Sequence, residues 1–200
     1  MANTRELQSR MKSIKDTMKI TSAMHMIASS NLQKAKKNLE ETEPYFYTLQ
    51  IMIAGILGHM QGGIEHQYFD ERPEIKEADR KKGYIVVTAD KGLAGGYNHN
   101  VIKLAQEFLD KPGHNELFVL GQLGRSYFEK KNVDVDTSFK YTVQKPTMHR
   151  ARVIAEKMLD LFNRKELDEV HIIYTRMENA VEMVAETKQL LPLQSGAFCE

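Results

Sequence analysis

A heptad pattern near the start of this 200-residue sequence constrains the fold more than any other feature. From residue 7 to residue 39, mostly apolar side chains recur at alternating intervals of four and three residues, for more than four heptads without a break. This spacing puts one apolar stripe along a helix and is typical of a coiled-coil strand. The positions of the stripe are Leu7, Met11, Ile14, Met18, Thr21, His25, Ala28, Leu32, Ala35 and Leu39. The sequence therefore predicts a long helix that needs a partner along its side.

The predicted helix begins at Thr4, which is a suitable N-cap, and runs to about residue 58. No proline or glycine interrupts the pattern before Pro44, where we expect a bend or a break. At ~1.5 Å per residue, this helix would be about 80 Å long, which exceeds the width of a small domain. It therefore cannot pack wholly against the rest of its own chain.

Within this helix, the segment MKITSAMHMIASS (18–30) has apolar side chains on nearly every side. A helix that is apolar all round is normally buried all round. Two interpretations stay open: a core helix in which methionines fill the packing, or a shaft that other chains enclose. In the second case, the many Met and small residues would give a smooth and adaptable surface.

Charge is unevenly distributed along the chain, although its net charge is only +1. Residues 1–40 hold eight Lys or Arg and three acidic residues, whereas the remainder holds 20 basic and 24 acidic residues. A basic arm on a mildly acidic body predicts contact with an acidic surface. Nucleic acid is not the expected partner, because the arm has no aromatic side chain before Tyr45 and its lysines share the helix with methionines.

Residues 61–83 are polar, with glycines and a proline, and are expected to form an exposed connection; after them, strand and helix patterns alternate. Strands are predicted at 84–88, 116–121, 169–175 and 180–193, with a further short candidate at 133–139. Helices are predicted at 100–110, 123–131 and 148–166, the last capped by Thr147. This order predicts an α/β fold with a small, mainly parallel, Rossmann-like sheet and helices on both faces. The predicted division is a shaft helix (1–60), the connecting segment (61–83), an α/β body (84–193) and the start of a C-terminal segment (194–200).

The stretch VVTADKGLAGGYNHN (86–100) joins the first predicted strand of the body to its first predicted helix. Phosphate groups often bind at such a place in a parallel sheet. The glycine spacing nevertheless matches neither a P-loop nor a dinucleotide-binding fingerprint, and Lys91 precedes the glycines instead of following them. Three interpretations stay open at this point: a phosphate cradle, a structural turn, or a loop whose glycines let a partner approach closely.

No sequence pattern predicts a catalytic site, a cofactor or a metal ion. The seven histidines form no pair spaced three or four residues apart, and Cys199 is the single cysteine. The longest apolar stretch, IMIAGILG (51–58), is far shorter than the ~20 residues that a transmembrane helix requires. Any membrane association is therefore expected to go through partners.

Three segments together resemble a known family: KITSAMHMIASSNLQKAKK (19–37), ADKGLAGGYNHNV (89–101) and KQLLPL (188–193). They resemble the gamma subunit of F-type ATP synthases, in the order of that family and at about its spacing. The most specific parts are the Ile-Thr-x-Ala-Met-x-Met run that begins at Ile20 and the Gly-Leu-x-Gly-Gly loop that begins at Gly92. The resemblance covers essentially the whole chain.

The resemblance implies a central rotor shaft that couples transmembrane ion flow to ATP synthesis or hydrolysis. It implies a hexamer of alpha and beta subunits around the shaft, and an epsilon subunit and a ring of c subunits below the body. Catalysis is then expected on the beta subunits, and the chain is expected at the cytoplasmic face of the bacterial cell membrane as a peripheral protein. The alternative is a coiled-coil adaptor with a Rossmann-like ligand-binding domain.

The resemblance also implies which residues touch partners. They are Met18, Ile20, Met24, Ile27 and Lys34 on the shaft, and Lys91, Gly92, Leu93 and Ala94 on the loop. The apolar shaft residues resemble a bearing surface, and Lys91 is expected to meet the acidic lower rim of the beta subunits. The family often has an acid in place of His25, a Lys in place of Asn31 and a Cys in place of Ala94, which weakens the transfer of exact contacts at these positions but not the resemblance itself.

Members of the family normally continue into a second shaft helix that pairs with the first. The chain is therefore expected to be a fragment or a shortened relative that lacks this C-terminal helix. Without a partner, the arm is expected to be mobile or to self-associate through residues 7–39.

Overall fold

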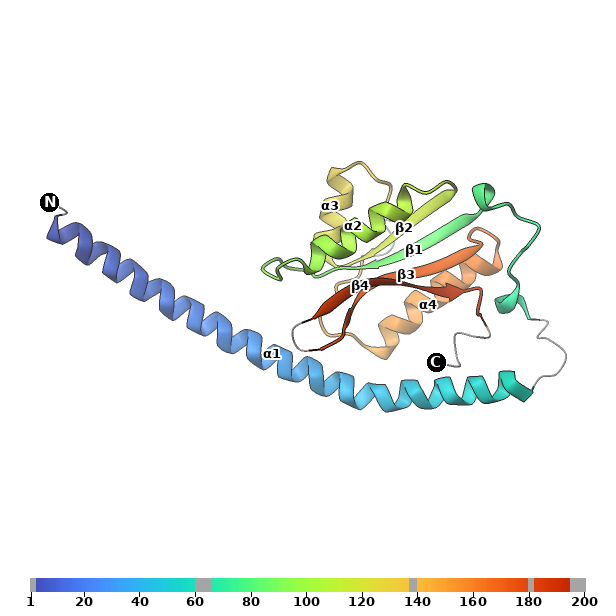
Figure 1. Ribbon diagram of the computed structural model, residues 1–200, viewed down its shortest axis with the longest axis horizontal. Coiled ribbons are helices and arrows are strands. Elements are labelled where there is room, and N and C mark those ends of the chain that lie inside the picture. The colour runs from blue at the N-terminus through green and yellow to red at the C-terminus, as the bar shows by residue number, and fades with distance from the viewer. Residues whose placement is uncertain (1–2, 60–65, 137–139, 180–181, 195–200) are drawn as a thin grey trace. The chain divides into compact units, whose positions relative to one another are not determined.

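A computed structural model describes residues 3–59, 66–136, 140–179 and 182–194 of the chain. The chain divides into two compact units, one made mainly of the first helix and the other of the body that follows it. Figure 1 draws both units, and each is described by itself below.

The first unit is one continuous helix, α1 (Thr4–His59), which confirms the predicted long helix. Its first turn is held by Asn3, because the backbone N–H of Arg5 donates to Asn3 Oδ1 over 3.3 Å and the N–H of Leu7 donates to the Asn3 carbonyl over 3.2 Å. The N-cap prediction at Thr4 was therefore wrong by one residue. The cap lies just before the helix, where an Asn side chain accepts readily from the free N–H groups.

Pro44 lies inside α1 without ending it. Proline has no N–H to donate to the preceding turn, so it usually bends a helix that continues through it. Figure 1 shows that α1 changes direction where its colour passes from blue to cyan. No described residue of α1 is buried, so the apolar stripe of the helix is left without a covering surface.

The body is built on a four-stranded sheet with the order β2-β1-β3-β4. The strands are β1 (Lys81–Val87), β2 (His114–Leu120), β3 (Glu169–Met177) and β4 (Met183–Leu191). β1 pairs in parallel with both β2 and β3, and β4 runs antiparallel to β3. The prediction of a mainly parallel sheet is confirmed, with the closing strand as its antiparallel edge.

Helices cover both faces of this sheet, as predicted (Figure 1). They are α2 (Tyr97–Leu109), α3 (Gln122–Lys130) and α4 (Met148–Asn163), and α4 begins at the predicted cap, where Thr147 Oγ1 accepts from the N–H of Arg150. Because side chains alternate along a strand, neighbouring residues of β1 belong to different cores. Val86 packs in the core that contains α2 and α3, whereas Ile85 packs with α4 residues such as Phe162.

The connecting segment before β1 is less exposed than predicted. It contains two short 3-10 helices, η1 (Gln67–Phe69) and η2 (Glu77–Asp79), and β1 begins three residues earlier than expected, at Lys81. Arg72 is only 4% exposed and Lys82 is also buried, which corrects the expectation of an exposed connection there. The candidate strand at 133–139 is reduced to one bridge between Val135 and Leu117, and residues 137–139 lie outside the described residues.

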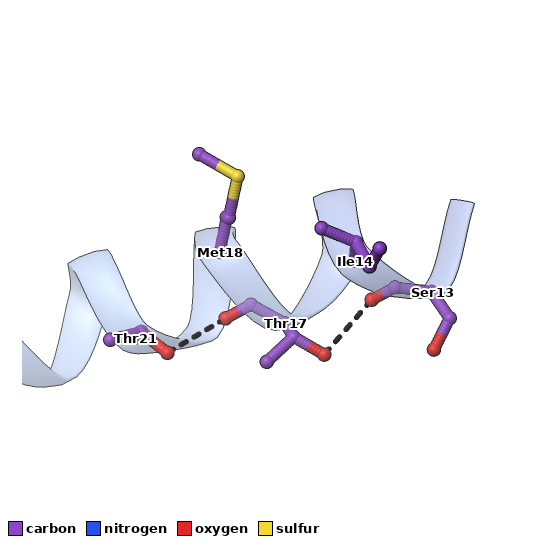
Figure 2. Close-up of a pocket in the computed structure, with 5 residues that line it drawn as sticks. All are labelled: Ser13, Ile14, Thr17, Met18 and Thr21. Carbon is purple, nitrogen blue, oxygen red and sulfur yellow. Dashed lines mark hydrogen bonds between the residues drawn. The ribbon is translucent and has the colours of Figure 1, made fainter. Parts of the chain in front are cut away.

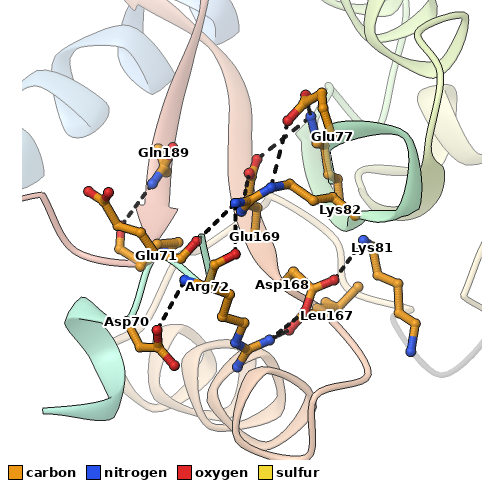
Figure 3. A network of polar contacts seen from close by, with 12 residues as sticks. Asp70, Glu71, Arg72, Glu77, Lys81, Lys82, Leu167, Asp168, Glu169 and Gln189 are labelled. Carbon is orange, nitrogen blue, oxygen red and sulfur yellow. Dashed lines mark hydrogen bonds and ion pairs between the residues drawn. The ribbon is translucent and has the colours of Figure 1, made fainter. Parts of the chain in front are cut away.

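Arg72 joins this connecting segment to residues that lie at the end of α4 and just before β3 (Figure 3). Its Nη1 lies 2.7 Å from Asp168 Oδ1 and 2.8 Å from the Leu167 carbonyl, and its Nη2 lies 2.7 Å from the Phe162 carbonyl. The guanidinium also lies over the Phe162 ring, 4.2 Å from its centroid. Asp168 in turn accepts from the N–H of Lys81 through Oδ2, so one buried carboxylate holds both the connection and the start of β1.

We expect Asp168→Ala to lower the free energy of unfolding of the isolated chain by about 3–5 kcal/mol, because it leaves the buried guanidinium of Arg72 without its counter-charge. Asp160→Ala is the matched control, since it breaks an exposed pair with Arg164 and should cost less than about 1 kcal/mol. Urea unfolding of both variants measures the difference. Equal costs would contradict this account of the buried pair.

Glu169 gives the body a defined dependence on acid. The hydrogen bond from His171 is the largest cause that holds the pKa of Glu169 below its ordinary value of 4.5, and the cations of Lys82 and Arg80 act in the same direction, while burial opposes them. Because the folded-state pKa is lowered, the stabilisation is present above the unfolded-state pKa and is lost as the pH falls through the folded-state pKa.

We therefore expect the urea midpoints of the wild-type chain and of Glu169→Gln to converge as the pH falls from about 5 towards about 3. The exposed residue Glu107 supplies the control, and Glu107→Gln should follow the wild-type midpoint across this range. A constant difference between Glu169→Gln and the wild type over the whole range would show that ionisation of Glu169 does not stabilise the fold.

Candidate interaction surfaces

The apolar collar of α1 consists of Met18, Ile20, Met24 and Ile27, and all four side chains are more than half exposed. Lys34, which lies further along the same helix, is exposed as well. Exposure of large apolar side chains in a row marks a surface that another chain covers. The exposure of these side chains does not fit a core helix. It agrees with the other interpretation of this segment, a shaft that other chains enclose.

An open hollow on the surface of α1 begins just before the collar and is lined by Ser13, Ile14, Thr17, Met18 and Thr21 (Figure 2). The hydroxyl of Thr17 donates to the Ser13 carbonyl and that of Thr21 donates to the Thr17 carbonyl, each at a distance of 2.9 Å. These hydrogen bonds to the preceding turn occupy both hydroxyl protons. The hollow therefore presents mainly the carbon and sulfur atoms of Ile14 and Met18 to a partner.

The glycine loop, residues 88–96, leaves β1 at the carboxyl edge of the sheet and leads into α2. Its base is fixed by three polar side chains, Thr88, Asn98 and Asp90. Thr88 Oγ1 donates to the Leu120 carbonyl and accepts from the N–H of Gly124, each at a distance of 3.0 Å. Asn98 Oδ1 accepts from the N–H of Ala89 over 2.7 Å. The loop therefore stands on a rigid base, although its tip is exposed.

Asp90 braces the loop from the other side. Its Oδ1 accepts from the N–H of Gln122, and its Oδ2 accepts from the N–H groups of Val143 and Gln144, at 3.1 to 3.2 Å. An Asp side chain that accepts several backbone N–H groups organises a turn without any regular element. This carboxylate joins three separate segments of the body.

The four predicted loop contacts lie together at the exposed tip. Lys91, Gly92, Leu93 and Ala94 are all exposed, and Leu93 reaches 93% exposure with a φ of 65°. In the part of the chain that the structure describes, Lys91 takes part in no ion pair, so its ammonium group is free to meet an external carboxylate. An exposed Leu beside an exposed cation is unexplained by the packing of the body itself.

The glycines of the loop differ in what the chain requires of them. Gly95 has a φ of 56°, which favours glycine, so a structural turn explains this position. A Cβ at Gly92 would meet only the Leu123 side chain, at 4.0 Å, and one at Gly96 would make ordinary contacts with Asn100. The packing of the chain therefore does not require glycine at 92 or 96, so a structural turn does not explain these two glycines.

The phosphate interpretation gains no support from the geometry of the loop. An anion at the amino end of α2 would use the first free N–H groups of the helix. The N–H of Tyr97 instead donates to the Ala94 carbonyl at a distance of 3.2 Å, so the first of these N–H groups is already occupied. Among the described residues there is no group of three or more His, Cys, Asp or Glu that could hold a metal ion.

Sequence reasoning missed the residues that support these surfaces. In the sequence, Asp90 and Asn98 appear only as parts of the glycine motif, although Asp and Asn that flank a glycine loop often bond to the backbone through their side chains. Arg72 stood in a polar stretch with no local pattern. Its partners lie 90 to 96 residues away in the sequence, so no local signal could have identified it.

Comparisons with known proteins agree with the resemblance found in the sequence. The family model described as ATP synthase matches residues 3–198. The ATP synthase gamma chain of Ruminiclostridium cellulolyticum is 47% identical over 199 residues, which are 99% of this chain and 67% of that protein. The chain belongs to the ATP synthase gamma-chain family. The gamma chain of Acetivibrio thermocellus is 45% identical and is covered to the same extent, so this chain spans about two thirds of the length of these two relatives.

Solved structures show the same fold. The central stalk of the Tetrahymena thermophila mitochondrial ATP synthase matches with a TM-score of 0.63 at 22% identity, over 86% of this chain and 72% of that one. For this member of the gamma-chain family, the long helix and the mostly parallel sheet are thus an established architecture. No helix in the described part of the chain is both long and apolar enough to cross a membrane.

Two glycine substitutions separate structural from functional positions in this gamma-chain relative. We expect Gly121→Ala to destabilise the body by about 3 kcal/mol, because its φ is 94° and its Cβ would lie 2.2 Å from the Thr88 carbonyl oxygen. Gly92→Ala should change the free energy of unfolding by less than about 0.5 kcal/mol, because it has room for the methyl group. Chemical denaturation tests both, and a large loss at Gly92 would favour a purely structural loop.

Proposed function

We propose that this chain acts as the central-stalk rotor subunit of an ATP synthase and couples transmembrane ion flow to ATP synthesis or hydrolysis. The observation that carries the proposal is a family match over residues 3–198 together with a 56-residue helix that has no buried residue. The chain supplies no catalytic residue in this scheme. ATP is made or hydrolysed on beta subunits of a surrounding alpha–beta hexamer.

The mechanism is conformational coupling. The shaft presents different side chains at different angles, so it stabilises the open or the closed state of each beta subunit in turn as it rotates. A rotor can shift these states only by the difference in its interaction energy with them. The collar suits this role, because Met18, Ile20, Met24 and Ile27 offer flexible apolar contacts that slide without specific polar bonds.

The glycine loop is proposed to touch the acidic lower rim of the beta subunits. Lys91 supplies the charge, Leu93 an apolar point of contact, and Gly92 with Ala94 the small surface that lets a backbone come close. An exposed ion pair contributes at most about 1 kcal/mol, so Lys91 would add modestly to affinity and would also set the orientation and speed of contact. The rigid base formed by Thr88, Asp90 and Asn98 supports this role, because it keeps the tip in place.

The remaining partners follow from the same proposal. The body contacts an epsilon subunit and a ring of c subunits, and the chain lies at the cytoplasmic face of a bacterial cell membrane. It reaches the membrane only through these partners. No nucleic acid, metal ion or cofactor takes part in its function.

Affinity purification of the full natural gene product from the membranes of its own cells tests the proposal. Alpha, beta, epsilon and c subunits should accompany it in constant proportion, with ATPase activity. Recovery alone or with unrelated proteins would contradict the rotor function and favour a coiled-coil adaptor.

Calorimetric titration of the chain with ATP, ADP and NAD should give no heat, and measurable binding would favour a nucleotide-binding enzyme instead.

Reversal of charge at the loop tests its proposed contact. We expect Lys91→Glu to raise the Kd for the alpha–beta hexamer by about tenfold at low salt, since attraction is replaced by repulsion. Lys103→Glu on α2 makes the same change in net charge at another exposed position and should leave the Kd within about twofold. Equal effects of the two variants would mean that the rim does not meet the loop.

A further inference from the structure

The connection between α1 and the sheet passes through residues 66–82, so any twist that travels along the chain from the helix to the body must pass through this segment. Its regular structure is limited to the two short helices η1 and η2 and the first residues of β1. Such short turns resist bending poorly by themselves. The stiffness of residues 66–82 must therefore come from their contacts with the body, which Figure 3 shows.

The first of these contacts is the fork of Arg72. Its guanidinium reaches Asp168 and the carbonyls of Phe162 and Leu167, all within 2.8 Å, and the side chains of Arg72 and Asp168 are only 5% and 4% exposed. A planar guanidinium with several fixed acceptors defines an orientation as well as a distance, which a single point charge does not. Arg72 therefore fixes how the connection is turned against the end of α4 and the start of β3.

A second set of contacts lies eight residues further on. Arg80 Nη1 lies 3.0 Å from Glu169 Oε1, and Nη2 bonds the carbonyls of Glu71 and Arg72. Lys82 bonds Glu77 and lies 3.9 Å from Glu169 Oε2. The connection is thus cross-linked to itself and to the first residue of β3.

A third contact joins the connection to the chain that leaves β4. The N–H of Leu193 donates to the Tyr68 carbonyl at a distance of 2.6 Å. The segment that enters the body and the segment that follows its last strand therefore lie side by side. Residues 66–82 together with 162–169 and 193 form what we call the joint.

We propose that Arg72 is a positioning residue that makes the joint rigid, so that twist entering along the connection turns the whole sheet. The inference rests on the proposed rotor function and extends it to a residue far from the collar and from the glycine loop. Without the guanidinium contacts of Arg72, residues 66–82 can separate from α4 and β3 when the rotor works under load. The defect should then appear only when the rotor works against resistance.

The test uses the complete ATP synthase in inverted membrane vesicles that carry Arg72→Met. ATP hydrolysis is measured without a gradient, and the steady-state gradient is measured with a proton-sensitive dye or, for a sodium enzyme, by sodium uptake. We expect unloaded hydrolysis within about 1.5-fold of the wild type and a gradient lowered at least twofold at equal hydrolysis. Arg72→Lys keeps the charge but loses the planar guanidinium, and its gradient should lie between those of the wild type and of Arg72→Met.

Arg176→Met is the control for the loss of a paired Arg away from the joint, because Arg176 lies in β3 and forms ion pairs with Glu178 and with Glu186 of β4, although its side chain is more exposed than that of Arg72. It should keep the wild-type gradient. A wild-type gradient in Arg72→Met, or hydrolysis and gradient that fall in equal proportion, would overturn the proposal, since the second result is that of a merely destabilised subunit. Should Arg72→Met fail to assemble, Asp168→Asn, which keeps one oxygen acceptor, is judged by the same two criteria.

Failure of the proposed function gives a different result from failure of this inference. If the proposed function is wrong, the wild-type chain itself will be missing from the vesicle ATP synthase, and both proposals fall. An assembled wild-type enzyme with no load-dependent defect in the variants would overturn the role of Arg72 alone.

Discussion

The apolar stripe of α1 is the constraint on which the rest of the account depends. A helix of 56 residues with no buried residue gains no stability from a core of its own, although helices in proteins are stabilised mainly by such packing. The large apolar side chains along its length are more than half exposed at nearly every position, from Leu7 to Ile56. The chain therefore makes physical sense as one component of an assembly, which is what membership of the gamma-chain family provides.

The body answers a different physical need, because it must present a few contacts from a rigid frame. At the carboxyl edge of the sheet, buried or braced polar side chains hold the base of the glycine loop while Leu93 and Lys91 stay exposed. At the opposite edge, Arg72 and Asp168 hold the connection against the sheet. Contact surface and anchorage thus lie at opposite ends of the same strands, and the parallel sheet lies between them.

How far the sequence predicts this structure depends on the range of the interactions. The heptad spacing, the Thr147 cap and the alternating apolar strands are local signals, and the corresponding elements appear within a few residues of the expected positions. The Thr4 cap was misplaced by one residue because Asn3 and Thr4 are both good caps and only geometry distinguishes them. The buried connection was missed because Arg72 and Asp168 lie 96 residues apart, and a polar stretch looks the same whether its charges are solvated or paired. The loop glycines needed the structure too, since only the backbone shows that the positive φ of Gly95 favours glycine, and only the surrounding space shows that Gly92 could carry a methyl group.

Direct observation of rotation tests the central claim most directly. The assembled ATP synthase would be fixed through its alpha–beta hexamer, with Cys199 replaced by Ser and a probe attached to Glu129→Cys, an exposed position on α3. The account predicts sustained rotation of the probe in one direction that begins with ATP and stops when ATP is removed. A probe that only fluctuates about one angle while the same molecules hydrolyse ATP would contradict the rotor function of this chain.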